Sequence, residues 1–489
     1  MRYPKRAYTF SVDYFSTPES VDPFFDAAVF FWAEITLCLL IQTYVRIIIA
    51  EVILMAYDYS HEPHRTVFLI DNKSFYASVE SIERGLNPLR TLLVVMSEQE
   101  NTNGGLILAT SPMAKKIYGL KSNVSRQRDL PVDKHLIVVP PRMNLYIKKN
   151  LAINDIFREF VANEDLWPYS IDESILDLTH TWRLFGKTPR AVAQLIQHTI
   201  RHRLGLYTTV GIGENPLQAK IALDVYAKHD PNLIGQISYQ TVPDTIWQIT
   251  NMTDVWSIGQ RTAAHLARMG ITTMKQLAHA NPYALKQELG IIGTQLFALA
   301  WGIDRTKISE RVITREPSIG NSQVLPRDYS NQVEIEIVIK EIGEQVAARL
   351  RHHHKRAGEI SLGIGFSYAE SEKDGRGGFH QTKRILPTNR DGDLVATLQL
   401  IFRQNWHGEV IRNVAVYTGR LAPDTGEQLN FFEPVDQQIK ATNLERTLDT
   451  IRDRFGFKGL IYAKSAMHGG TAIQRASLVG GHNGGNSYD

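Results

Sequence analysis

Residues 169–178 read Tyr169-Ser170-Ile171-Asp172-Glu173-Ser174-Ile175-Leu176-Asp177-Leu178, an adjacent acidic pair between two apolar, strand-like runs. We interpret this stretch as a β-hairpin with Asp172 and Glu173 at its tip. Upstream, Asp71 ends another apolar run, residues 67–70, which is typical of a buried central strand. If these strands are neighbours, Asp71 and Asp172 can hold a divalent metal ion, with Glu173 beside it. Mg²⁺ prefers such carboxylate oxygens, and a pair of ions can serve a phosphoryl transfer.

Each acid alone has a simpler interpretation. An Asp that follows a strand is more often a turn residue or a helix cap than a metal ligand. The hypothesis of a metal site therefore depends on what surrounds the three acids.

The composition is that of an ordinary globular protein. The chain has 489 residues, which predicts two to four domains, and 43% of them are hydrophobic and 21% charged. The net charge of +3 neither requires nor excludes a nucleic acid partner. The single cysteine, Cys38, excludes an intramolecular disulfide framework and a cysteine-built metal site, and it favours a cytoplasmic location.

The first 54 residues differ from the rest. Residues 28–54 are mostly apolar and long enough to span a membrane, but Glu34, Arg46 and Glu51 interrupt them with charge that is costly inside a bilayer. The segment also fits a signal peptide poorly. We interpret residues 1–54 as an extension outside the functional fold, and we expect Met55 to be the natural start.

Residues 67–227 alternate between strand-like and helical patterns. We expect strands at residues 67–70, 92–96 and 208–212, and helices after Ser74 as a cap and at residues 109–119, 144–160, 189–204 and 215–227. This order predicts a mixed sheet backed by helices. The helix at 109–119 carries Lys115 and Lys116, which by charge pattern alone form a solvated face.

A Gly-containing turn, residues 257–262, precedes the next helix. Its glycine, Gly259, frees the turn, and the backbone N–H groups after it can bind a phosphate. Residues 290–293 repeat the pattern more weakly. Simple helix packing explains such a hairpin equally well. Residues 306–319 are polar and predict a linker.

The C-terminal part predicts a helix followed by an open sheet. A helix with apolar positions from Ile335 to Leu350 ends in three histidines, which point in different directions on a helix and favour a basic helix end over a metal site. Residues 359–367 then alternate, with Ser361, Gly363 and Gly365 on the polar face. Later strands near residues 382–386 and 414–417 complete the sheet. Its polar face and the nearby basic side chains suit a phosphate backbone.

Together these residues resemble the Y family of lesion-bypass DNA polymerases, and most closely the UmuC-type UV-damage-repair branch of Gram-positive bacteria. The resemblance runs from about Met55 to the end of the chain. The residues that carry it are Asp71 with residues 75–80 (Phe-Tyr-Ala-Ser-Val-Glu), residues 170–173 (Ser-Ile-Asp-Glu), Gly211-Ile212-Gly213 through Ala219-Lys220-Ile221-Ala222, and residues 469–473 and 478–482.

The resemblance implies an α+β multidomain fold. The palm, a mixed sheet with helices, covers residues 65–75 and 141–232, and the small fingers cover 76–140. A helical thumb with a helix-hairpin-helix covers 233–305, followed by the linker at 306–319. An α/β little-finger domain covers 320–421, and residues 422–489 are a C-terminal tail.

The resemblance also assigns roles to residues. The metal-binding and catalytic acids are Asp71, Asp172 and Glu173, with two Mg²⁺ ions or alternatively Mn²⁺. The steric gate against ribose is Tyr76, and the triphosphate-binding residues are Lys116 and Lys220. The expected DNA contacts are Ser257, Gly259, Arg261, Lys383 and Arg384. Lys73 and Met113 depart from the residues that many members have at these positions.

The implied function is template-directed DNA synthesis across damaged DNA, in DNA repair and the SOS response. The substrates are then primer–template DNA and deoxynucleoside triphosphates, and no membrane is involved. One alternative is another palm-type nucleotidyl transferase or cyclase, which needs neither a thumb hairpin nor a basic C-terminal sheet. Another is a catalytically silent DNA- and clamp-binding accessory protein, against which the intact acids argue.

A short motif in the tail suggests a protein partner. Gln428, Leu429, Phe431 and Phe432 follow a predicted turn and are similar to a sliding-clamp-binding peptide of bacteria. Aromatic and apolar anchors of this kind enter a pocket on the partner. The alternative is that the two phenylalanines pack on their own domain, because five-residue motifs are common by chance.

Overall fold

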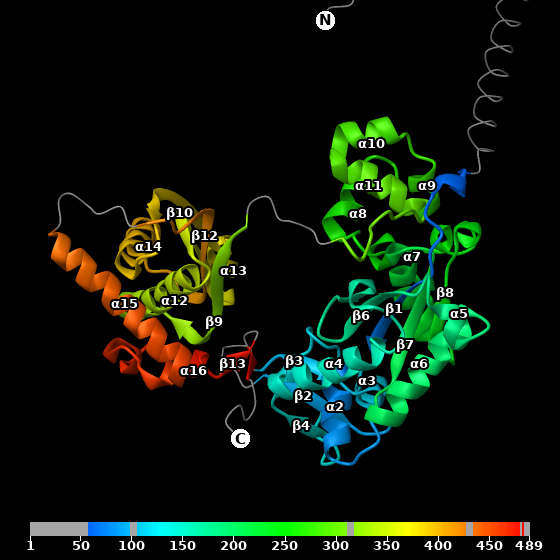
Figure 1. The fold of residues 1–489 in the computed structure, drawn as a ribbon, viewed down its shortest axis with the longest axis horizontal. Coiled ribbons are helices and arrows are strands. Elements are labelled where there is room, and N and C mark those ends of the chain that lie inside the picture. Colours follow the sequence, from blue (N-terminus) through cyan, green and yellow to red (C-terminus); the bar gives the residue numbers. More distant parts are fainter. Residues whose placement is uncertain (1–56, 98–104, 311–316, 427–433, 480–481, 484–489) are drawn as a thin grey trace, which may run out of the picture.

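The computed structural model describes residues 57–97, 105–310, 317–426, 434–479 and 482–483 (Figure 1). The predicted extension at 1–54 and the four clamp-motif residues therefore lie outside the described residues. Within the described part, no helix has the length and apolar character that a membrane crossing requires.

The N-terminal body is built on a five-stranded sheet in the order β5-β6-β1-β7-β8. β1 lies at the centre and pairs antiparallel with β6 and β7, whereas β7 and β8 are parallel, so the sheet is mixed as predicted. The four apolar residues Val67–Ile70 of β1 are at most 1% exposed. The strands are β1 (Val67–Asn72), β5 (Leu166–Pro168), β6 (Glu173–Asp177), β7 (Thr208–Gly213) and β8 (Ile234–Gln236).

Helices cover both faces of this sheet. On one face Phe68 and Ile70 pack against α2 (Phe75–Glu83), α4 (Met143–Phe157) and α6 (Pro189–Leu204). On the other face Leu69 and Ile175 pack against α7 (Pro216–Ile221), which continues as a π-helical turn over Ala222–Tyr226. The predicted helix at 189–204 is confirmed, with Thr188 as cap and Gly205 as its left-handed end.

Two glycines let α7 approach β7 closely. A Cβ at Gly211 would lie 2.0 Å from the carbonyl oxygen of Ala219, and one at Gly213 would lie 2.4 Å from the Ala219 nitrogen. No side chain fits these positions, which explains the Gly-Ile-Gly pattern of β7. The close packing fixes Lys220, the next residue of α7, at the edge of the sheet.

The fingers form a three-stranded sheet in the order β3-β2-β4. The strands are β2 (Leu93–Met96), β3 (Ile107–Thr110) and β4 (Ile137–Val139). The prediction of helix from residue 109 is wrong, because Ala109 and Thr110 pair with β2 and the helix α3 (Pro112–Tyr118) begins only after its cap Ser111. Ser74 does precede α2, but with a φ of 49° its side chain caps nothing.

The thumb contains α8 (Gln260–Arg268), α9 (Met274–Ala278), α10 (Pro282–Leu289) and α11 (Ile291–Ala300), and its core also includes Leu217 and Ile221 of α7. The palm sheet extends into the segment assigned to the thumb, because β8 pairs with β7. Three strand residues are too short a run to stand out by periodicity.

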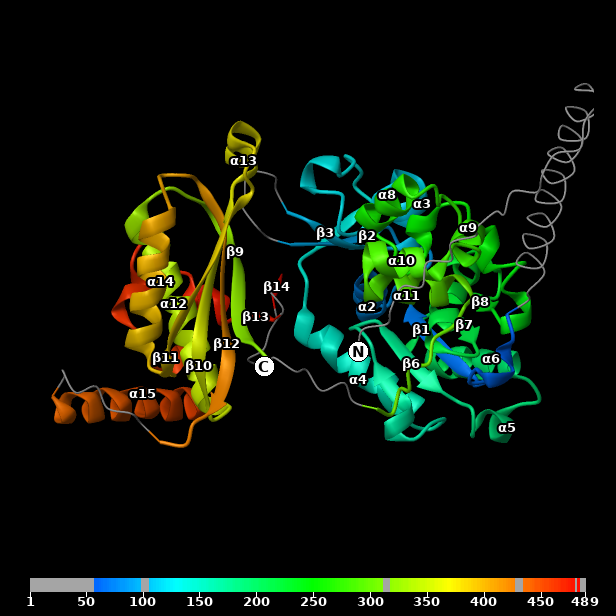
Figure 2. The ribbon, with the colours of Figure 1, turned by 90° about the horizontal axis from the view of Figure 1, so that it is seen from above.

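The C-terminal body is a four-stranded antiparallel sheet in the order β11-β10-β12-β9, with α12 and α14 on one side of it (Figure 2). Alternation along β10 buries Ile360 and Leu362 under these helices, as predicted. The elements are β9 (Ile319–Tyr329), α12 (Gln332–His352), β10 (Lys355–Phe366), α13 (Tyr368–Asp374), β11 (Gly378–Thr388), α14 (Asp391–Asn405) and β12 (Ile411–Pro423).

The assignment of residues 422–489 to a tail is wrong for most of the described part of that segment. A 21-residue helix, α15 (Val435–Phe455), crosses near the C-terminal end of α12 (Figure 2). It is followed by α16 (Ala472–Arg475) and the short strands β13 (Leu478–Val479) and β14 (His482–Asn483). The anchor of α15 is polar: Arg351 of α12 binds Asp449 at 2.6 Å. The sequence of α15 therefore has only a weak apolar periodicity, and this is why the helix was not predicted.

Candidate active site

The three predicted acids lie together at one end of the palm sheet. Asp71, near the end of β1, stands directly opposite Glu173, the first residue of β6. Residues opposite one another in an antiparallel pair have Cβ atoms about 5 Å apart on one face of the sheet. The carbonyl oxygen of Asp172 accepts hydrogen bonds from the backbone nitrogen and the Nδ2 of Asn72, each at 2.9 Å. The two strands are therefore neighbours, which was the condition for a metal site formed by these acids.

Ser170 shapes the hairpin tip. Its Oγ donates to Asp172 Oδ1 at 2.8 Å and accepts from the Glu173 backbone nitrogen at 2.9 Å. The backbone nitrogens of Tyr169 and Ser170 both donate to the Glu173 carbonyl oxygen. The turn therefore holds the acidic pair through short local bonds.

Burial and the two neighbouring acids raise the proton affinity of Asp71. Burial raises the pKa of Asp71 to about 7, with a further contribution from the charge of Asp172 and a smaller one from Glu173, while Lys228 and Lys220 act against the rise. A cation at this edge would relieve the repulsion between the carboxylates.

The side chains do not converge on one point in this conformation. In the part of the chain that the structure describes, no three His, Cys, Asp or Glu groups are arranged to hold a metal ion. Glu173 Oε1 instead accepts from Lys220 Nζ at 2.7 Å, and Asp172 Oδ1 is bound by Ser170. Carboxylate oxygens are the donors that Mg²⁺ prefers, and the backbone positions of the three acids bring them to one place. Metal binding would require the Glu173 carboxylate to turn away from Lys220.

Lys220, the expected triphosphate-binding residue, lies beside Glu173. It is 9% exposed and lies between Glu173 and Asp224, which is 3.2 Å away. Asp224 in turn binds Lys228 at 2.7 Å. Of these charged residues, Asp224 lies on the π-helical turn after α7, and such turns are frequent at functional sites.

Tyr76 lies half-buried at the start of α2. Its ring stacks on Tyr146 of α4, with centroids 4.4 Å apart and planes 14° from parallel. Burial raises the pKa of Tyr76, and the charge of Asp172 contributes to the rise. Behind it, the hydroxyl of Tyr146 donates to the fully buried Glu80 at 2.8 Å, and Arg142 binds the same carboxylate through two nitrogens.

Sequence reasoning missed Tyr146 and Arg142. The only signal was Glu80 itself, because an acid in an otherwise apolar helix face needs a buried partner. The pairing spans 62 residues to Arg142 and 66 to Tyr146, and no local pattern predicts such a contact.

Lys116 is exposed on α3, and so is its neighbour Lys115. Burial lowers the pKa of Lys73. The charge of Asp71 opposes this shift, and the charge of Lys115 adds to it. Lys115 was recognised in the sequence only as part of a solvated face.

The thumb turn presents its predicted residues to solvent. Ser257, Gly259 and Arg261 are exposed, while Ile258 between them is 2% exposed and anchors the turn in the thumb core. Gly259 has an ordinary φ of −84°, and a Cβ added there would meet no atom within 4 Å. Neither the backbone conformation nor the internal packing therefore requires a glycine at position 259. A glycine here is consistent with a bound molecule that approaches the backbone closely.

The little-finger residues Lys383 and Arg384 are both exposed on the edge strand β11. The register pairs Lys383 with Ile360, which faces the helices, and Arg384 with Glu359, which faces the open side. Neighbouring strand residues point to opposite faces. Only Arg384 therefore shares a face with Ser361, Gly363 and Gly365.

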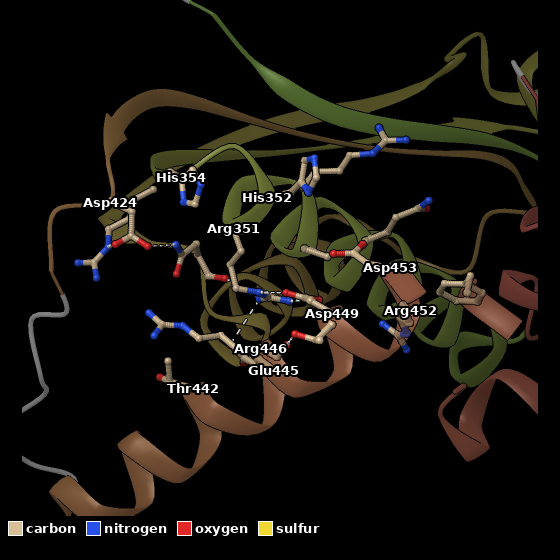
Figure 3. Close-up of a pocket in the computed structure, with 17 residues that line it drawn as sticks. Arg351, His352, His354, Asp424, Thr442, Glu445, Arg446, Asp449, Arg452 and Asp453 are labelled. Carbon is tan, nitrogen blue, oxygen red and sulfur yellow. Dashed lines mark hydrogen bonds and ion pairs between the residues drawn. The ribbon is translucent and has the colours of Figure 1, made fainter. Parts of the chain in front are cut away.

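A cavity of about 830 Å³ lies elsewhere, between the end of α12 and α15. Figure 3 shows Arg351 in its centre, reaching toward Asp449. Arg351 also binds Asp391 at 2.7 Å, and burial followed by the charge of Asp391 raises the pKa of Glu445 to about 7. These charged side chains pair with one another. We therefore interpret the cavity as part of the contact between α12 and α15 and not as a ligand site.

Comparison with known proteins gives consistent matches. The model of the impB/mucB/samB family matches residues 70–224, and that of the impB/mucB/samB family C-terminal domain matches residues 316–431. A relative in Bacillus subtilis (strain 168) named as a UV-damage repair protein, UvrX, is 39% identical over 427 residues, which are 87% of this chain and 99% of the relative.

Two further similarities point the same way. DNA polymerase IV 2 of Bacillus subtilis (strain 168) is 34% identical over 86% of this chain and 98% of its own length. Among solved structures, a Y-family DNA polymerase chimera of Dbh and Dpo4 matches with a TM-score of 0.59 and 19% identity, over 73% of this chain and 99% of the chimera. The structural match supports the fold described above.

Proposed function

Because this chain belongs to the impB/mucB/samB family, the Y family of DNA polymerases, we propose that it is the polymerase that extends a primer across damaged template bases. The observation that carries the proposal is the register of the palm sheet, which sets Asp71 opposite Glu173 with Asp172 beside them. DNA-directed DNA polymerase activity follows from the family, and the damaged-template function is consistent with the relatives named for UV-damage repair and as DNA polymerase IV.

The three carboxylates are the groups that would hold Mg²⁺. When bound, two such ions would stabilise negative charge on the attacking and leaving oxygens of a nucleotidyl transfer. Lys220, held at the same edge by α7, would pass from Glu173 to the triphosphate, where its charge is needed. Lys115 and Lys116 of α3 supply further positive charge from the fingers side.

Two surfaces would hold the DNA. On the thumb, the exposed turn with Gly259 leaves its backbone open to a phosphate. On the little finger, Arg384 and the open face of β10 provide a second contact that reads no sequence. Distributed phosphate contacts of this kind make affinity depend on salt rather than on any one residue.

Primer extension on paired templates tests this function. We expect the purified protein with Mg²⁺ to extend a primer on an undamaged template and past a single ultraviolet photoproduct in an otherwise identical template. A high-fidelity polymerase that stops at the photoproduct is the matched control. Absence of extension on both templates, with DNA binding retained, would instead favour the silent accessory protein.

The clamp-binding motif remains a prediction, and it has a direct test. We expect a variant with Leu429, Phe431 and Phe432 replaced by Ala to lose stimulation by a bacterial sliding clamp, because the apolar anchors no longer fill the pocket. Tethering raises effective concentration at the primer end, and only that gain should disappear. Clamp-free synthesis should be unchanged. Equal stimulation of the variant and the unmodified protein would contradict the prediction.

A further inference from the structure

Three half-exposed aromatic rings meet beside the active site. Trp167 lies on β5, Tyr169 on the hairpin three residues before Asp172, and Trp256 immediately before the thumb turn. Trp167 and Tyr169 meet edge to face with centroids 5.6 Å apart, and Tyr169 and Trp256 do so at 6.3 Å. The rings remain 40%, 37% and 37% exposed. We refer to these three residues as the aromatic cluster.

The aromatic cluster lies on the catalytic face of the palm sheet. Trp167 is opposite Ile175, and Ile175 is opposite Leu69. Residues two apart on a strand share a face, so Leu69 lies on the face of Asp71, and Ile175 on that of Glu173. The rings and the carboxylates are therefore neighbours on one surface.

A small cavity joins the cluster to the catalytic residues. It has a volume of about 90 Å³, and Lys220, Leu69 and Ile175 line it together with all three rings. Trp256 also borders a second cavity of about 620 Å³, which Ser257 of the thumb turn lines as well. The cluster thus extends from the acids to the candidate phosphate-binding turn.

Exposed aromatic side chains at a nucleic acid site have a known physical use. Single exposed apolar residues are ordinary, but contiguous ones mark interaction surfaces. Aromatic faces bind bases and sugars of any sequence, because every nucleotide offers an apolar face. A polymerase has to hold every primer sequence equally, so a stacking surface suits it better than hydrogen bonds to base edges.

We propose that Trp167, Tyr169 and Trp256 form a platform for the last nucleotides of the primer strand. The inference rests on the proposed function, in which the primer 3′-hydroxyl has to reach the acids at the hairpin tip. A primer whose phosphates contact the thumb turn and whose end meets Asp172 has to cross the surface that these rings cover. The platform orients the 3′ end, and it acts before chemistry.

Equilibrium binding to a primer–template with a dideoxy-terminated primer tests the platform without catalysis. Trp167→Leu, Tyr169→Leu and Trp256→Leu each keep an apolar side chain but remove a ring. We expect each to weaken primer–template binding by roughly 5- to 150-fold, the range for loss of one stacked ring. Binding of a closed circular duplex, which has no primer 3′ end and no unpaired bases, should change by less than about twofold, below the effect of one stacked ring. Tyr169→Phe keeps the ring and should restore binding.

The control is Tyr283→Leu, because Tyr283 is 82% exposed on α10 and lies outside the aromatic cluster. Its affinity for both DNAs should equal that of the unmodified protein. Unchanged primer–template affinity in all three cluster variants, with a lower melting temperature, would show that the rings only brace palm against thumb and would overturn the inference. Equal weakening on both DNAs would also overturn it. Failure of the unmodified protein to extend primers would reject the proposed function alone, because this assay measures binding.

Discussion

Asp172→Ala should abolish nucleotide incorporation while leaving DNA affinity nearly unchanged. Asp172 lies at the hairpin tip, with its backbone held by Asn72 and its carboxylate at the edge where Asp71 and Glu173 meet. Removing one of three metal-binding carboxylates costs several kcal/mol of transition-state stabilisation, and a loss of about 4 kcal/mol is roughly a 10³-fold lower rate. Glu173→Ala should have a comparable effect, because it removes the partner of Asp71.

The matched control is Asp155→Ala, since Asp155 is exposed on α4 and pairs with nearby Arg158. Single-turnover primer extension and binding to the same DNA should be measured for all variants. Asp155→Ala should behave as the unmodified protein does in both assays. Full extension activity in Asp172→Ala would refute the assignment of the acids, whatever the DNA affinity.

The palm was predictable because its signals are local and redundant. A continuous apolar run gave β1, and Thr188, Pro189 and Gly205 mark both ends of α6 in the sequence itself. The Gly-Ile-Gly pattern of β7 reports the close approach of α7, which the structure explains by the space at Gly211 and Gly213. The pairing of β1 with β6, and hence the meeting of the acids, was only a condition of the metal-site hypothesis, and the register of the sheet meets that condition.

The remainder depended on contacts between distant residues. Helix α15 is held to α12 by ion pairs of Arg351 with Asp449 and Glu445, so it lacks the apolar stripe that reveals a helix. The ion pair of Lys220 with Glu173 was also not predicted, because the sequence analysis assigned Lys220 to the triphosphate and Glu173 to a metal ion. Sequence patterns identify which groups gather at the site, but not how they pair before a ligand arrives.

The aromatic cluster illustrates the same limit. Tyr169 is the first residue of the hairpin segment 169–178. The contact of its ring with Trp256, which lies 87 positions later in the chain and in another domain, could not be predicted from that segment. Trp167 is apolar at a strand position where burial is the ordinary expectation. Only the register with Ile175 shows that the ring stands on the catalytic face.

Tyr76→Ala should admit ribonucleotides. The ring of Tyr76 is fixed by its stack on Tyr146, which is itself held by Glu80, so the gate cannot move aside for a larger sugar. Forcing an extra atom against a fixed ring costs about 1–3 kcal/mol. Relief of that clash should raise the ratio of ribonucleotide to deoxyribonucleotide incorporation by roughly 5- to 150-fold.

The experiment compares this ratio, at matched primer ends, in the unmodified protein, Tyr76→Ala and Tyr76→Phe. Tyr76→Phe keeps the ring and its stack, so its ratio should equal that of the unmodified protein. Tyr76 also packs against the palm core, and its loss should lower the melting temperature as well. The two roles separate cleanly, because packing affects both sugars alike, whereas a gate changes their ratio. A destabilised but folded Tyr76→Ala protein with an unchanged ratio would reduce Tyr76 to a core residue and leave the rejection of ribose to another group.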